Sequence, residues 1–196
     1  MVGKELQIRV FFFLFFCFSL PFDQVQKRFR NPTIRNLIQV IEKHFQLTFS
    51  TKQYWKLAVW LGIMQNRFDY RDKHQHQIAA ETVHMIEQDV FYQELKNILA
   101  RYLSRFAFQW SDEEAIYLYL FFLTEGLLPM NKKQLQQSAF TAQFLAVNQK
   151  IYQTIVEENH SEMFDSFLLE LHIKLAFSKG WIDTEENDTL LLSDQD

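Results

Sequence analysis

The chain of 196 residues is 48% hydrophobic and 16% aromatic, with four glycines and three prolines, a composition that suits a large core and disfavours a turn-rich β-sandwich or barrel. The formal net charge of −4 argues against a domain that grips nucleic acid by its phosphates, since such domains carry a basic face. The single Cys17 excludes an internal disulfide and favours a reducing compartment. A small basic cluster is interpreted as a solvated helix end and consists of Lys27, Arg28, Arg30 and Arg35.

Six phenylalanines stand within residues 10–20, in the stretch VFFFLFFCFSL. Pro21 ends this run, which is shorter than the roughly 20 apolar residues that a membrane-spanning helix needs. Lys4 and Arg9 would suit the basic region of a signal peptide, but Glu5 is acidic and no small-residue cleavage site follows. We therefore predict a helix from residue 3 to residue 20 that is packed between other helices, with a signal peptide or anchor as the alternative.

Two well-punctuated helical patterns follow. Asn31 is a typical N-cap and Pro32 suits the first helical position, and apolar residues then recur every three or four positions as far as Phe45. Ser50 and Gln53 have the spacing of a capping box, which starts a strongly apolar pattern in the segment FSTKQYWKLAVWLGIMQNRF. The sequence therefore predicts two helices joined by a short connection.

The second half of the chain keeps the helical period. Residues 67–77 are polar and indicate a connection, and apolar stripes resume from Ile78 to Phe106. Ser111 and Glu114 form a second capping box before an almost wholly apolar helix, which Gly126 is expected to end. Two more amphipathic helices are predicted within residues 131–158 and residues 161–179, the second with Ser161 as N-cap and Gly180 just beyond its end.

The fold class predicted from these patterns is all-α, a bundle of about seven helices. The break that follows Gly126 divides the chain into two helical units, residues 1–128 and residues 129–182. The remaining residues, 183–196, form an acidic tail that we expect to be frayed.

The motifs of common enzymes do not occur in the sequence. A glycine-rich phosphate loop, HExxH, GxSxG and CxxC are all lacking, so we predict no catalytic residue, no cofactor and no metal site. A helical enzyme with a metal held by Asp72, His74, His76 and His84 is an alternative, but this spacing is unspecific and a solvated loop is favoured. His172, beside the apolar stripe of its helix, is interpreted either as a half-buried structural histidine or as a phospho-acceptor.

Three segments carry a resemblance to a known family. TKQYWKLAVWLGIMQNRF resembles the second helix of PRDs, the phosphotransferase-system regulation domains of bacterial transcription regulators. GKELQIRVFFFLF, with Gly3, Glu5, Ile8 and Arg9 as matching residues, and the Pro21–Phe22 pair are similar to the opening helix of the branch represented by the Mga and AtxA virulence regulators. DEEAIYLYLFFL is similar to a later PRD helix. The resemblance covers residues 3–128 as a first PRD and residues 131–182, more loosely, as the start of a second.

The resemblance implies control by phosphorylation of histidine. Histidines of PRDs accept a phosphoryl group from carrier proteins of the phosphotransferase system, which adds up to about two negative charges. The family has one histidine seven residues before a basic residue, a position that in this chain is Trp60, before Arg67. Another family histidine lies near the end of the DEEAIYLYLFF helix, where this chain has Leu120 and Phe121. Neither position keeps a histidine.

Candidate phosphohistidines must therefore be sought elsewhere in the chain. His172 stands seven residues before Lys179, which resembles the family spacing with lysine in place of arginine. His74 and His76 are near the first family site and are further candidates, although they do not align with it.

The function expected from the resemblance is that of a regulatory, non-catalytic module of a Mga-type transcription regulator in the cytoplasm. PRDs of this kind pair, so we expect a homodimer, with phosphotransferase carriers as further partners and no membrane contact. DNA is expected to be bound only through a helix-turn-helix region, which no residues before Met1 supply, so the chain is expected to be a fragment or a shortened relative. The alternative from another class is a secreted or membrane-tethered helical protein.

Overall fold

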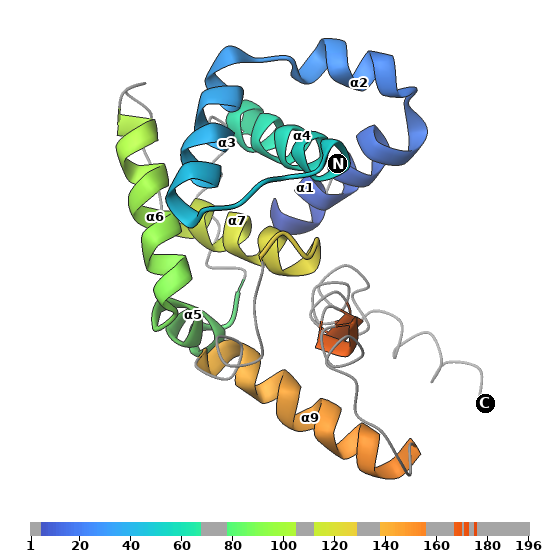
Figure 1. Cartoon of the computed structure of the whole chain (residues 1–196), viewed down its shortest axis with the longest axis vertical. Helices are drawn as coiled ribbons and strands as arrows, with labels where there is room; N and C mark the ends of the chain where they lie inside the picture. The colour runs from blue at the N-terminus through green and yellow to red at the C-terminus, as the bar shows by residue number, and fades with distance from the viewer. Residues whose placement is uncertain are drawn as a thin grey trace, which may run out of the picture.

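The protein is described by a computed structural model over residues 5–67, 78–104, 112–128 and 138–155, together with residues 167–169, 171, 172 and 175. Every element in these ranges is a helix (Figure 1), so the predicted all-α fold is confirmed. The elements are α1 (Glu5–Leu14), the π-helical turn η1 (Phe15–Ser19), α2 (Phe22–Phe29), α3 (Pro32–Phe45), α4 (Thr51–Arg67), α5 (Ala80–Glu87), α6 (Val90–Leu103), α7 (Asp112–Thr124) and α9 (Ala139–Ile155).

The short helix α2 was missing from the sequence-based prediction. It begins directly after Pro21, and its apolar residues Val25 and Phe29 lie four positions apart and are buried. Two apolar anchors in eight residues give a weak periodic signal, which explains why this helix was interpreted only as a solvated helix end. The four basic residues of that region are exposed in the structure, at positions 27, 28, 30 and 35.

The predicted helix starts are formed by local hydrogen bonds. The Asn31 side chain accepts a hydrogen bond from the Thr33 backbone N–H at 2.8 Å, and Pro32 follows as the first residue of α3. At α4, the Ser50 N–H donates to Oε1 of Gln53 at 3.0 Å, and the Gln53 N–H donates to Oγ of Ser50 at 3.3 Å. This reciprocal pair is the capping box that the sequence predicted.

The end of α7 is also as predicted. Gly126 has φ 58°, in the left-handed region that a residue without Cβ adopts at little cost. The Leu127 N–H then donates to the carbonyl of Phe122 at 2.9 Å, which satisfies a carbonyl of the last helical turn. Leu127 is buried, so the turn also anchors the chain against the core.

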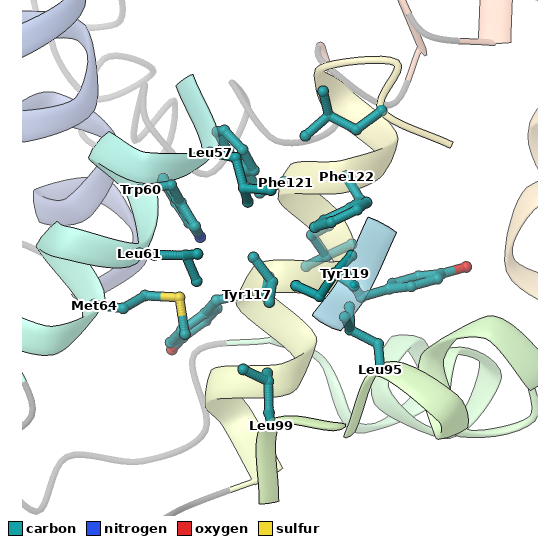
Figure 2. Packing of buried hydrophobic residues seen from close by; sticks show 14 of the residues in the cluster. Leu57, Trp60, Leu61, Met64, Leu95, Leu99, Tyr117, Tyr119, Phe121 and Phe122 are labelled. Carbon is teal, nitrogen blue, oxygen red and sulfur yellow. The ribbon is translucent and has the colours of Figure 1, made fainter. Parts of the chain in front are cut away.

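Helix α7 lies at the centre of the core. All its residues from Glu114 to Leu123 are buried. Figure 2 shows α7 between two helices, with Leu57, Trp60, Leu61 and Met64 of α4 on one side and Leu95 and Leu99 of α6 on the other. A helix covered on both sides needs apolar residues all round, and this is what the sequence of α7 supplies.

Helix α9 joins the same core. Phe140 in its first turn is 4% exposed, and its ring lies 6.3 Å from the ring of Tyr119 in α7. The start of α9 also lies beside α5, and the two helices are in contact (Figure 1). Residues on both sides of position 128 therefore contribute to one buried cluster. The predicted helix 161–179 is represented by six helical residues, whereas Ser161, Gly180 and the acidic tail 183–196 lie outside the described residues.

The phenylalanine-rich segment forms α1 and η1 and is buried on one face only. Phe13 and Phe16 are buried, whereas Phe11, Phe15 and Phe18 are 50%, 43% and 75% exposed. This differs from the expectation of a helix enclosed between others, because α4 and α7 cover only the inner side of α1. Among the helices of the described ranges, none combines the length and the apolar character needed to cross a membrane.

Candidate regulatory site

A chain of ion pairs joins α1 to the start of α7 and the end of α4. Arg9 donates from Nη1 and Nη2 to the two carboxylate oxygens of Glu114, at 2.5 Å and 2.8 Å. The Arg9 Nε–H also donates to Oε1 of Glu5 at 2.8 Å, one helical turn earlier. Arg67, the last residue of α4, donates to both oxygens of Glu5 at 2.7 Å. We call these four residues the ion-pair chain.

Two neighbouring members of the ion-pair chain, Arg9 and Glu114, are removed from water. The side chains of Arg9 and Glu114 are 2% and 3% exposed, and the guanidinium of Arg9 also lies 5.0 Å from the centre of the Tyr117 ring. Burial alone would lower the pKa of Arg9, but its bonds to Glu114 and Glu5 outweigh that effect and raise the pKa above its usual value. Arg9 is therefore charged at any physiological pH.

Glu5 responds in the opposite direction. Burial alone would raise the pKa of its carboxyl, but the hydrogen bonds and charges of Arg67 and Arg9 prevail and hold that pKa below its usual value. Glu5 is accordingly ionised near neutral pH and bridges two guanidinium groups. The ion-pair chain therefore fixes three helices that are far apart in the sequence.

Sequence analysis did not predict the ion-pair chain. It assigned Glu114 to a capping box with Ser111, whereas both Glu114 oxygens accept hydrogen bonds from Arg9, and Ser111 lies outside the described residues. The sequence did contain one signal for these ion pairs, namely charged residues that stand at the edges of apolar runs. Arg9 directly precedes an apolar run and Glu114 directly precedes another, and a charge at the edge of a buried helix usually needs an opposite charge from elsewhere.

Beside the ion-pair chain lies a stack of three aromatic rings from α1, α4 and α7. The ring centroids of Trp60 and Phe121 are 4.6 Å apart with 12° between their planes. Phe13 meets both rings edge to face, at 5.9 Å from Trp60 and 5.1 Å from Phe121. All three side chains are buried, so this aromatic stack is dry and tightly packed.

Comparison with known proteins assigns the central part of this fold. Residues 35–125, which begin within the first turn of α3 and extend just past the end of α7, match the model of a family described as the PRD domain. This segment is a PRD domain. No curated protein and no solved structure matches the chain at a significant level. PRD domains are regulatory, and the chain therefore contains a regulatory domain.

The aromatic stack occupies the two positions of the PRD at which the resemblance implies histidines. The first is Trp60, and the second is the pair Leu120 and Phe121, of which Phe121 contacts Trp60. An indole and a phenyl ring cannot accept a phosphoryl group. The two positions to which the resemblance points therefore meet in the folded structure, where their side chains pack together and supply no nucleophile.

His172 is the candidate phospho-acceptor that the structure describes, and it is half-buried against Asn148 of α9. The Asn148 amide lies between groups of fixed hydrogen-bonding character: the Leu169 N–H can only donate and the Phe144 carbonyl can only accept. The amide therefore directs its oxygen to the Leu169 N–H at 3.2 Å, and its nitrogen to the Phe144 carbonyl at 3.2 Å and to Nδ1 of His172 at 2.5 Å.

This contact determines the tautomer of His172. Because Asn148 donates to Nδ1, the lone pair of Nδ1 is occupied and the ring proton of the neutral imidazole is on Nε2. In this arrangement neither ring nitrogen has a free lone pair. Nδ1 of His172 is therefore satisfied by a hydrogen bond, and phosphoryl transfer would require Asn148 to rotate away.

Of the remaining histidine candidates, the structure describes one. His74 and His76, with Asp72, lie outside the described residues. His84, the fourth member of the alternative metal site, is exposed and its Nε2 lies 3.0 Å from the Gln88 side chain. Within the described ranges, groups of three or more metal-ligating side chains are not found.

Proposed function

We propose that this chain is the regulatory, non-DNA-binding module of a Mga-type transcription regulator in the cytoplasm. The observation that carries the proposal is the PRD match over residues 35–125, within an all-helical core that extends beyond the matched segment at both ends. A PRD has no chemistry of its own to perform, and its role is to change the pairing or the arrangement of the regulator that contains it.

The assignment to the Mga branch is supported by α1. Glu5 and Arg9 are among the residues through which α1 resembles the opening helix of that branch. In the structure the same two residues form the middle of the ion-pair chain, bonded to Glu114 and Arg67 of the PRD segment. The opening helix is thus an integral part of the regulatory module.

We propose that the regulatory signal reaches this chain by another route than in a PRD that has histidines at both of the positions discussed above. Trp60 and Phe121 stack in the core, so a phosphotransferase signal must enter elsewhere or be replaced by another input. We assign the main regulatory step to self-association of the module. Phosphorylation by phosphotransferase carriers is assigned to His172, with His74 and His76 as the next candidates.

Phosphorylation of His172 would have a defined structural consequence. The P–N bond of a carrier phosphohistidine breaks as a new P–N bond forms to a ring nitrogen of His172, and the ring proton of His172 passes to the imidazole that the carrier releases. Attack by Nδ1 displaces the Asn148 amide from the lone pair of that nitrogen. Attack by Nε2 first requires the ring proton to move to Nδ1, which also displaces the Asn148 donor. Either route loosens the contact between α9 and the segment that contains His172.

Labelling with phosphoenolpyruvate and purified phosphotransferase carriers tests this input. We expect the chain to be labelled, His172→Ala to abolish the label, and Asn148→Ala to accelerate labelling because it frees Nδ1. His44→Ala is the matched control, since the His44 side chain is exposed and its hydrogen-bond partner is Glu94, which is not part of the His172 contact. Label that persists in His172→Ala would move the assignment to His74 or His76.

The regulatory function itself is tested in a reporter strain. The chain is fused behind a DNA-binding domain that represses its operator only as a dimer, and repression is expected if the module pairs. Repression equal to that of the unfused DNA-binding domain, together with the absence of any phosphoryl label, would contradict the proposed function.

A further inference from the structure

Helix α1 has apolar residues on two sides, one that is covered by the core and one that is exposed. Its two charged residues, Glu5 and Arg9, point into the protein, where they form the ion-pair chain with Glu114 and Arg67. Its opposite side is apolar and exposed. A surface helix of a monomer ordinarily has one apolar side, which faces inward, and its opposite side carries polar and charged residues in water.

The exposed side of α1 and η1 is one continuous stripe. It consists of residues spaced at i, i+3, i+4 and i+7, which we call the outer aromatic face: Phe11, Leu14, Phe15 and Phe18. The rings of Phe11 and Phe15 already stack on each other, with centroids 6.5 Å apart and 13° between their planes. Between Arg9 and Asp23 the sequence has no charged residue.

The size of this face suits a protein interface. With about 200 Å² for a fully exposed phenylalanine, the observed exposures give roughly 400 Å² of apolar surface for the outer aromatic face. A standard interface takes about 800 Å² from each partner, and a little over half of that area is non-polar. The outer aromatic face therefore supplies about the non-polar area that one partner contributes.

The chemistry of the face fits a second copy of the same chain. Two identical stripes related by a two-fold axis would pack antiparallel, with Phe18 of one copy near Phe11 of the other and Phe15 near the axis. Because the stripe has no charge, no like charges meet across that axis. A membrane surface fits less well, because interfacial helices carry basic side chains along their own polar side, whereas the one cation of α1 and η1, Arg9, is buried and paired. The exposed cations nearby, Lys27 and Arg28, belong to α2.

We propose that the outer aromatic face is the surface through which two copies of this chain pair. The inference rests on the proposed function, which assigns regulation to self-association, and adds the surface that mediates it. Since the non-polar area is near that of a standard interface and the face is centred on aromatic rings, Phe18, the most exposed of them, is expected to be a principal contributor.

Sedimentation of the full chain between about 1 and 100 μM tests the proposal, a range chosen for an interface of standard size. The wild-type chain is expected to form a dimer, and Phe18→Glu to weaken pairing at least ~100-fold because it places a charge in the apolar contact. Val40→Glu is the matched control, since Val40 is an exposed apolar residue of α3, away from the stripe. Near-UV circular dichroism of each variant verifies that the fold is retained.

The outcomes separate this proposal from the proposed function. If the wild type and Phe18→Glu pair equally well, the assignment of pairing to the outer aromatic face is refuted, whereas self-association of the module stands. If the wild type is monomeric throughout, self-association is refuted together with the face.

A photo-cross-linking residue gives an independent measurement. With p-benzoylphenylalanine in place of Phe18, irradiation is expected to yield a covalent dimer whose cross-link maps to α1 or η1 of the second copy, whereas the same residue in place of Val40 should yield none. Cross-linking confined to lipid, in the presence of phosphatidylglycerol–phosphatidylcholine vesicles, would overturn the assignment in favour of a membrane surface.

Discussion

Replacing Arg9 by methionine removes the cation that both oxygens of Glu114 bind. The Glu114 carboxylate, 3% exposed, would then be buried with its charge uncompensated. Methionine retains the length and the helix propensity of the replaced side chain, so the perturbation is confined to the charge and its hydrogen bonds. Glu5 keeps its two bonds to Arg67, so the loss falls mainly on Glu114.

The expected magnitude is large for a single substitution. Removal of one partner of a buried ion pair typically lowers the free energy of unfolding by about 3–5 kcal/mol. For a chain of this size each kcal/mol corresponds to about 2–4 °C in Tm, so Arg9→Met should melt roughly 6–20 °C below the wild type. Arg9→Met/Glu114→Leu should recover most of this loss, because no charge then remains buried at that place.

Urea unfolding followed by circular dichroism at pH 7 measures these differences. Arg35→Met is the matched control, since Arg35 is exposed on α3 and should change the free energy of unfolding by less than about 0.5 kcal/mol. The reasoning is refuted if Arg9→Met costs less than about 1 kcal/mol, or if the double variant is as unstable as the single one.

Three further predictions concern other parts of the core. A Cβ at Gly62 would lie 2.4 Å from Cδ1 of Phe29, so Gly62→Ala should lower the free energy of unfolding by about 1–3 kcal/mol in urea titrations, and a neutral effect would show that the Phe29 ring moves aside easily. Because the pKa of Glu5 is lowered in the folded protein, its contribution is present above the usual carboxyl pKa and lost as the pH falls through the folded value; Glu5→Gln should therefore flatten the fall in stability below about pH 5, and a profile with the wild-type slope would contradict this. Burial raises the pKa of the Cys17 thiol to about 11, so Cys17 should react with a thiol reagent at pH 8 far more slowly in the native protein than in urea, and equal rates would count against its burial.

The sequence by itself determined the local elements of this protein. The starts of α3 and α4 and the end of α7 depend on side chains within a few residues of each helix end, such as Asn31, Ser50 and Gly126, and each was predicted correctly. The fold class followed from the helical period of the apolar residues. The short α2 was not predicted, because its two buried apolar residues are too few to define a helical period.

Only the tertiary structure decided how these helices use their side chains. The pairing of Arg9 with Glu114 spans 105 positions, and the contact of Trp60 with Phe121 likewise depends on how α4 and α7 pack, which no local pattern encodes. For the same reason the sequence could identify a phenylalanine-rich helix but could not determine which of its faces is covered. Periodicity gives the angle at which side chains leave a helix, whereas burial depends on which other helices lie against it.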